Sequence, residues 1–144
     1  MAVTVEKVIT RKQIHEFIKF PYTLYKKDKN WVPQLLMDDY KKINRKKHPF
    51  YQHAEAEFFL ARKDGVVAGR IAAIHDAVWE QTHKEKAAYW GWFECVDDHA
   101  VAQQLFDAAL GWARGTPSAL GRSHGYAFSA FRLCASRVFP LSLR

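Results

Sequence analysis

Two strand-like segments joined by a tight turn constrain the fold of this chain more than any other feature. Ala56, Phe58 and Leu60 alternate with neighbours that point the other way, which predicts a strand with at least one well-buried face. After this strand, Asp64 and Gly65 both tolerate the positive φ that the central positions of a type I′ turn require. The sequence therefore predicts a β-hairpin and, with it, an antiparallel sheet.

Helices and further strands surround the hairpin in the order strand, helix, helix, three strands, helix. The other strands are expected at residues 2–9, 66–74 and 87–96. Thr10 and Gln13 have the spacing of a capping box that begins the first helix, and Pro21 is expected to end or kink that helix. Pro33 suits the first position of the second helix. Gly69 in the returning strand allows a helix to approach closely.

The last helix is strongly amphipathic and directly follows the third strand of the group. Its apolar stripe consists of Val101, Leu105, Phe106, Ala109 and Trp112. Asp97 and Asp98 supply an N-cap, and carboxylates near the positive end of a helix dipole stabilise the helix by roughly 0.3 to 1 kcal/mol. Gly115 is expected to end this helix.

Composition and cysteine spacing exclude several classes of protein. With 144 residues the chain fits one domain with a single core. No apolar run approaches the roughly 18 residues of a membrane span, and the amino-terminal residues lack the layout of a signal peptide. We therefore expect a cytoplasmic protein without a membrane partner. Cys95 and Cys134 do not form a closely spaced pair, so we expect neither a metal site nor a redox dithiol.

The net charge of +7 is concentrated in the first part of the chain. Every lysine lies at or before Lys86, with clusters at residues 26–29 and 41–47. Such a distribution could attract nucleic acid or a phosphate-rich ligand. A solvated, lysine-rich surface is the favoured interpretation, because no nucleic-acid-binding motif accompanies the lysines.

The residues after 114 differ in character from those before. No acidic residue follows Asp107, and the end is rich in Ser, Ala, Arg and Gly, with one weak strand candidate from Tyr126 to Phe131. Three interpretations remain open: a disordered tail, a poorly patterned terminal segment, or a shifted reading frame, which fits best. We therefore divide the chain into residues 1–114 and an atypical tail of residues 115–144.

Several separate segments together resemble the GNAT superfamily of acyl-CoA N-acyltransferases, and in particular a branch of poorly characterised bacterial GNAT-like proteins. These segments are residues 17–25, 30–36, 48–50, 61–74 and 91–95. The resemblance covers about residues 1–114 and fails afterwards, where the fold would add further strands and a helix. It implies an α+β fold, a largely antiparallel sheet flanked by helices that is incomplete at its carboxyl-terminal end.

The same resemblance implies an N-acyltransferase that moves an acyl group, such as acetyl, from acyl-CoA to an amine. The expected cosubstrate is acetyl-CoA or another acyl-CoA, the expected partners are this thioester and an unknown amine acceptor, and a homodimer is left open. Backbone groups of Phe93, Glu94, Cys95 and Val96 would pair with the pantetheine. The helix start, with Asp98 and His99, would face the pyrophosphate.

The junction between the last strand and the helix departs from the GNAT pattern. The usual glycine-containing loop is replaced by residues 94–98, which contain three carboxylates and no glycine. Like charges at about 4 Å cost on the order of 1 to 4 kcal/mol, which opposes pyrophosphate binding. The alternative is therefore a non-catalytic GNAT-like interaction module, in which Asp97 and Asp98 only cap the helix and an open sheet edge pairs with another chain.

The proposed reaction requires a base that takes a proton from the acceptor amine. Glu94 is the first catalytic candidate, because Trp92 and Phe93 could desolvate it and raise its affinity for a proton. A second possibility is Cys95 as an acyl-carrying nucleophile, which would need a base such as His99 nearby.

Overall fold

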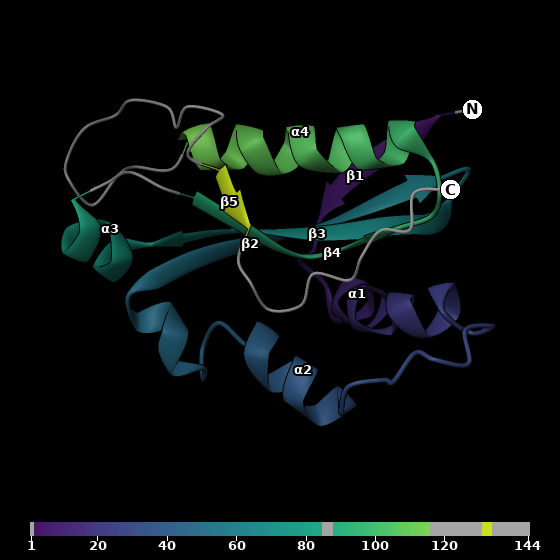
Figure 1. Ribbon diagram of the computed structural model, residues 1–144, viewed down its shortest axis with the longest axis horizontal. Coiled ribbons are helices and arrows are strands. Elements are labelled where there is room, and N and C mark those ends of the chain that lie inside the picture. Colours follow the sequence, from purple (N-terminus) through teal and green to yellow (C-terminus); the bar gives the residue numbers. More distant parts are fainter. Residues whose placement is uncertain (1, 85–87, 116–130, 134–144) are drawn as a thin grey trace.

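The computed structural model describes residues 2–84, 88–115 and 131–133. In this part of the chain, helices cover both faces of a five-stranded sheet with the strand order β1-β2-β3-β4-β5 (Figure 1). The strands are β1 (Val3–Lys7), β2 (Ala54–Lys63), β3 (Val66–Asp76), β4 (Ala88–Cys95) and β5 (Phe131–Leu133). The first four strands pair antiparallel, and β5 pairs parallel with β4. The expected α+β class and mainly antiparallel sheet are confirmed.

The helices form two layers around the sheet. They are α1 (Arg11–Leu24), α2 (Leu36–Ile43), α3 (Ala77–His83) and α4 (His99–Gly115), together with a 3-10 helix, Pro49–Gln52. Helix α4 covers one face of the sheet, and α1 and α2 lie on the other (Figure 1). The core on the α4 side includes Val101, Leu105 and Ala109, as the apolar stripe predicts. The core on the α1 side is built on Phe17 and Ile18.

Helix α1 begins as predicted but ends later. Thr10 and Gln13 form the capping box: the Gln13 N–H donates to Thr10 Oγ1 at 3.2 Å, and the Thr10 N–H donates to Gln13 Oε1 at 2.9 Å. Pro21 was expected to end or kink the helix; it lies inside α1, which continues to Leu24, so Pro21 does not end it. Pro21 cannot donate to the carbonyl of Phe17. Both residues are buried, and helix packing of this kind can outweigh one lost hydrogen bond.

Helix α2 begins at Leu36 rather than at Pro33, which corrects the predicted start. Its N-cap is Leu35, whose side chain makes no capping hydrogen bond. The preceding segment is held from outside, because Tyr22 Oη of α1 donates to the carbonyl of Gln34 at 2.6 Å. A contact to α1, distant in sequence, therefore restrains the chain just before this helix.

The hairpin and the glycine next to it agree with the sequence pattern. Asp64 and Gly65 have φ values of 53° and 80°, as a type I′ turn requires. Gly69 of β3 lies directly under α4, since a Cβ atom built there would lie 2.7 Å from Leu105 Cδ1 and 2.8 Å from Cys95 Cβ. The predicted close approach of a helix at Gly69 is thus confirmed.

Part of the predicted tail lies outside the described residues. Of the strand candidate at 126–131, only Phe131 is described, as the first residue of β5. The interpretations of residues 115–144 as disordered or frame-shifted concern mostly residues beyond those described. Among the helices that are described, none is both long enough and apolar enough to cross a bilayer.

Candidate functional site

Strand β4 carries a bulge close to its carboxyl end. The register places Gly91 and Glu94 opposite residues of β3 that flank a single residue, Ile71. Between the same two positions β4 has two residues, Trp92 and Phe93. Trp92 has a φ of 55°, a left-handed conformation that is uncommon for a bulky side chain. Bulges of this kind bend the strand, disrupt its pairing and often lie next to active sites.

Neighbouring side chains of β4 at the bulge lie on different faces of the sheet. Trp92 packs beside Phe17 on the α1 side, with ring centroids 5.9 Å apart. Phe93 packs on the other side against Phe106 of α4, with centroids 4.7 Å apart. Glu94 then lies on the α1 side again, so a carboxylate at the end of the strand enters the core beneath α1.

Arg70 and Glu94 form a buried pair between the sheet and α1. Their side chains are only 7% and 13% exposed, and Arg70 Nη2 lies 3.7 Å from Glu94 Oε1. Arg70 Nη1 also donates to the carbonyl oxygen of Phe17 at 2.7 Å. The guanidinium stacks over the rings of Phe17 and Trp92, at 5.0 and 5.3 Å from their centroids. These contacts fix the position of Arg70, and Arg70 in turn lies beside the carboxylate.

Two polar atoms of this pair lack a hydrogen-bond partner within the described part of the chain. They are Arg70 Nε and Glu94 Oε2, and both are buried. Buried polar atoms in proteins are almost always satisfied, by protein, by water or by a ligand. A carboxylate oxygen and an N–H group in this state can receive a polar ligand, with one accepting a hydrogen bond or proton and the other donating a hydrogen bond.

The electrostatic environment changes the proton affinity of Glu94. Burial raises the pKa of Glu94 above its ordinary value, while the Arg70 guanidinium opposes this shift and Asp39 adds to it. Burial also raises the pKa of Tyr25, and the charge of Glu94 contributes to that shift. Glu94 therefore takes up a proton more readily than an exposed glutamate, which is the direction required of a base that works near neutral pH.

Asp98 occupies the start of α4. Its Oδ1 accepts a hydrogen bond from the Ala100 N–H at 2.9 Å, and its carbonyl accepts one from the Ala102 N–H at 3.2 Å, so Asp98 is the N-cap that the sequence predicted. Lys63 Nζ, at the end of β2, donates to Asp98 Oδ2. The hydrogen bond from Lys63 lowers the pKa of Asp98 below its ordinary value. The acidic junction is thus partly neutralised by a lysine from the hairpin.

Comparison with curated proteins finds relatives of greater length. No family model matches the chain. It is 37% identical over 118 residues, 81% of its length, to a protein of Caulobacter vibrioides described as a bacterial ceramide synthase. It is 29% identical over 110 residues to Protein YghO of Escherichia coli. The chain spans 30% and 28% of these two proteins, less than a third of each.

Comparison with solved structures identifies the fold. A predicted acetyltransferase from Clostridium acetobutylicum, solved with acetyl-CoA, matches with a TM-score of 0.57 at 12% identity over 96% of this chain and 95% of that one. A ribosomal-protein-alanine N-acetyltransferase from Brucella melitensis matches with a TM-score of 0.51 at 22% identity over 78% and 72%. The chain has the GNAT acyltransferase fold. The expected GNAT-like architecture is therefore confirmed.

In this GNAT fold, part of the β4 edge has no strand partner in the described part of the chain. Strand β5 pairs only with the first residues of β4, from Ala88 to Trp90. Among the described residues, no strand pairs with the outer edge of β4 from Gly91 to Cys95. Within residues 2–84, 88–115 and 131–133 the edge at the bulge is therefore unpaired, and an extended ligand or another chain can pair there with the backbone.

The predicted cofactor-binding residues of this GNAT-like chain differ in whether their backbone groups are available to a ligand. The Val96 N–H donates to the Ala68 carbonyl at 2.9 Å, and the Asp98 N–H donates to the Val96 carbonyl at 2.7 Å, so neither N–H is available to a ligand. Because backbone groups alternate in direction along a strand, Cys95 directs its own backbone groups toward the open edge. His99 is exposed at the first position of α4.

The alternative role of Cys95 as a nucleophile receives no support from its surroundings. Burial raises the pKa of the Cys95 thiol, and the charges of Asp98 and Asp97 raise it further. The thiolate, which is the reactive form, is therefore disfavoured at neutral pH.

Sequence reasoning named Glu94 but missed the residues that act on it and on Asp98. Arg70 was visible only as the single charged residue of the predicted strand at residues 66–74. Lys63 is one of many lysines, and nothing local connects it with Asp98. A charged residue inside a strand that is buried on both faces is the one signal that could have identified Arg70, because such a charge requires a partner.

Proposed function

We propose that residues 1–114 form part of a GNAT-type N-acyltransferase in which Glu94 is the catalytic base. The observation that supports this most directly is the buried Glu94 Oε2 without a partner among the described residues, beside the open and bulged part of β4. The fold and the direction of the Glu94 pKa shift agree with the proposal. The reaction class agrees as well with the description of the Caulobacter relative, since a ceramide is an amide of a long-chain amino alcohol.

In this proposal the chain's own residues position an amine against an acyl-CoA thioester. Glu94 takes a proton from the acceptor ammonium group, and the neutral amine forms a C–N bond with the thioester carbonyl carbon. The C–S bond then breaks, and the CoA sulfur leaves with the proton that the nitrogen releases. Arg70 acts as a positioning residue, because it pairs with Glu94 and is itself held by the Phe17 carbonyl.

The two ends of CoA fit the structure to different degrees. The open edge of β4 near Cys95 suits an extended pantetheine arm, which can pair with strand backbone. The α4 start does not suit a pyrophosphate as it stands, because the Asp98 carboxylate already accepts the N–H that a phosphate would use. We therefore place the pantetheine at Phe93 to Cys95. We infer that the phosphates bind elsewhere than at the backbone N–H groups that begin α4.

Glu94→Gln tests the proposal, with Glu55→Gln as the matched control because Glu55 is exposed on the same sheet. Amide product is measured by mass spectrometry with acetyl-CoA and long-chain acyl-CoA as donors, and with short amines and a long-chain amino alcohol as acceptors. Glu94→Gln should lower kcat by about 10²- to 10⁴-fold and remove the rise of rate with pH, whereas Glu55→Gln should leave both unchanged. Full activity of Glu94→Gln would exclude Glu94 as the base.

The Asp98 cap favours a second candidate function, a non-catalytic module that pairs through the open edge of β4. Calorimetric titration with acetyl-CoA separates the two, since a GNAT-type enzyme must bind its thioester. Heat of binding that Glu94→Gln retains supports the enzyme. No binding at millimolar acetyl-CoA, together with no amide product, would contradict the enzyme and leave the module.

A further inference from the structure

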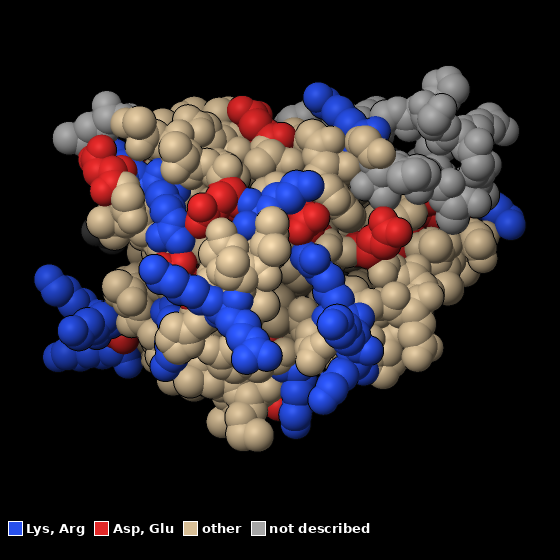
Figure 2. Space-filling model, turned by 180° about the vertical axis from the view of Figure 1, so that it is seen from behind, with Lys and Arg blue, Asp and Glu red and all other residues tan. Residues whose placement is uncertain are grey.

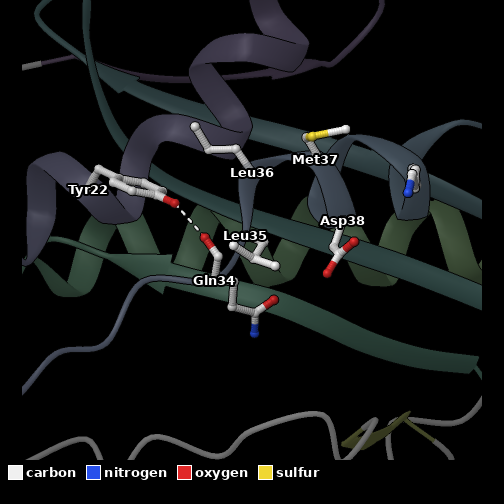
Figure 3. A pocket seen from close by; sticks show the side chains of 7 residues that line it. Tyr22, Gln34, Leu35, Leu36, Met37 and Asp38 are labelled. Atoms are coloured by element: carbon white, nitrogen blue, oxygen red, sulfur yellow. Dashed lines mark hydrogen bonds between the residues drawn. The ribbon is translucent and has the colours of Figure 1, made fainter.

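Large apolar side chains project into solvent where α1 connects to α2. Val32, Leu35 and Met37 are 75%, 74% and 72% exposed. Leu35 and Met37 also line an open pocket of about 410 Å³, together with Tyr22 and Lys41 (Figure 3). Single exposed apolar residues are common, but several of them within one short segment indicate an interaction surface.

Lysines lie on both sides of these apolar residues in the sequence. All of them are exposed: Lys26, Lys27, Lys29, Lys41, Lys42, Lys46 and Lys47. Residues 26–47 contain eight basic and three acidic side chains, and one of the acidic ones, Asp39, is buried. On the face that Figure 2 shows, more of the basic side chains lie over the half of the molecule formed by α1 and α2 than over the other half. We call Val32, Leu35, Met37 and these seven lysines the α1–α2 surface.

The chain that carries this surface is anchored to the fold. Trp31 packs against Tyr22 and Tyr25 of the adjoining helix and its C-cap, with ring centroids 5.1 and 5.5 Å apart. The Gln34 carbonyl accepts the hydrogen bond from Tyr22 Oη, and Lys42 Nζ lies 3.4 Å from Gln34 Oε1. The exposed apolar residues on either side of Gln34 are therefore presented by a restrained segment.

The charges of the α1–α2 surface are mostly available to a partner. Within the described part of the chain, Lys42 is the one lysine of this group with a carboxylate within 4.0 Å, that of Asp39. A partner that suits the whole surface must offer many negative charges over a wide area and an apolar interior just beneath them. An anionic lipid bilayer has both properties.

We propose that the α1–α2 surface docks on the face of an anionic lipid bilayer. Val32, Leu35 and Met37 enter the boundary between headgroups and acyl chains, and the lysines contact lipid phosphates. This proposal departs from the expectation of no membrane partner, which rested on the absence of a membrane span in the sequence; binding to the face of a bilayer needs no span. A nucleic acid would use the same lysines but would gain nothing from the apolar residues. The proposal does not rest on acyl transfer, because docking requires no substrate.

Co-sedimentation of the 144-residue chain with vesicles tests the proposal. The chain should bind vesicles of phosphatidylcholine with phosphatidylglycerol, should bind phosphatidylcholine alone much more weakly, and should dissociate as salt is raised. Leu35→Gln with Met37→Gln should weaken the partition at least about tenfold, since both side chains leave the apolar layer. Val78→Gln is the matched control, because Val78 is 49% exposed on α3, at the other end of the sheet (Figure 1).

The lysines are tested in the same assay. Lys26→Gln with Lys27→Gln should weaken binding to the anionic vesicles about tenfold or more. Arg11→Gln with Lys12→Gln removes equal charge from the first turn of α1, about 20 Å away along the helix, and should change binding much less. All of these positions are exposed, and circular dichroism confirms that each variant is folded.

Three outcomes would overturn the proposal. The first is no partition into anionic vesicles at low salt. The second is partition that the Leu35 and Met37 double variant leaves unchanged. The third is binding of generic RNA that depends on Lys26 and Lys27 while vesicles are not bound, which would make the surface a nucleic-acid site.

Discussion

Replacing Gly69 by Ala should destabilise this protein through a contact that the structure defines closely. The new Cβ atom would lie 2.7 Å from Leu105 Cδ1, 2.8 Å from Cys95 Cβ and 3.2 Å from the Glu94 carbonyl oxygen. The Leu105 side chain is fully buried, so it has little room to move. The other two atoms belong to β4, and relieving those contacts means shifting the strand that carries the candidate site.

The size of the effect follows from two opposing contributions. Overpacking a dense core by one methyl group costs about 1 to 3 kcal/mol. Ala in place of Gly recovers roughly 0.5 to 1 kcal/mol, because it restricts the unfolded chain. We therefore expect Gly69→Ala to lower the free energy of unfolding by about 0.5 to 2 kcal/mol. Urea unfolding followed by circular dichroism measures this change, and the melting temperature should fall by about 2 to 4 °C for each kcal/mol.

Gly111→Ala is the matched control. Gly111 lies within α4, and a Cβ atom there would meet nothing within 4 Å. Ala is the better helix former by about 1 kcal/mol, so this variant should be more stable than the parent protein. If Gly69→Ala were as stable as the parent, the close packing of α4 on β3 would be refuted. A loss of stability in both variants would instead refute the argument from local space.

Three further predictions concern caps and charges. Asp98→Asn keeps a capping oxygen but removes the negative charge beside the α4 start and frees Lys63 from its ion pair. Calorimetry should therefore show that CoA binds about fivefold more tightly. Unchanged or weaker binding would contradict this. The pKa of Asp98 is lowered, so its stabilising effect is present above the ordinary carboxyl pKa and is lost as the pH falls through the lowered value. Thermal scans should show that the melting temperature of the parent protein falls as the pH is lowered, and that the melting temperature of Asp98→Asn falls less. Thr10→Ala removes the cap of α1 and should cost about 1 kcal/mol in urea unfolding. Thr82→Ala should cost much less, because Thr82 is exposed and its hydroxyl donates to the Val78 carbonyl of its own helix.

The parts of the fold that depend on near neighbours could be predicted from sequence. The capping box of Thr10 and Gln13 and the turn at Asp64-Gly65 each involve residues within one turn of chain. The start of α2 could not be predicted, because the contact that holds the chain before Leu36 comes from Tyr22 on another helix. Local sequence preference favoured a helix start at Pro33, but contacts with α1 are consistent with the later start at Leu36.

The candidate site was predictable only in its position. The sequence pattern identified Glu94 and Asp98 from their place between β4 and α4. Their chemistry, however, depends on partners from β3 and β2. Arg70 comes to face Glu94 through the register of the sheet, and Lys63 reaches Asp98 because the hairpin ends near the start of α4. The bulge at Trp92 was equally hidden, because the sequence contains no glycine at the position with positive φ.

Pro21 leaves the Phe17 carbonyl oxygen without its usual helical donor, and Arg70 of the buried pair donates to that oxygen instead. A residue with an N–H at position 21 would compete with Arg70 for the carbonyl of Phe17, whereas Pro21 leaves that oxygen to the guanidinium. The gap in the hydrogen bonds of α1 is therefore used by a side chain of β3, and it ties the helix to the sheet at the place where Glu94 is buried. What sequence rules classify as a helix breaker is here a point of contact between helix and sheet, and the backbone of α1 helps to hold the arginine that lies beside the candidate base.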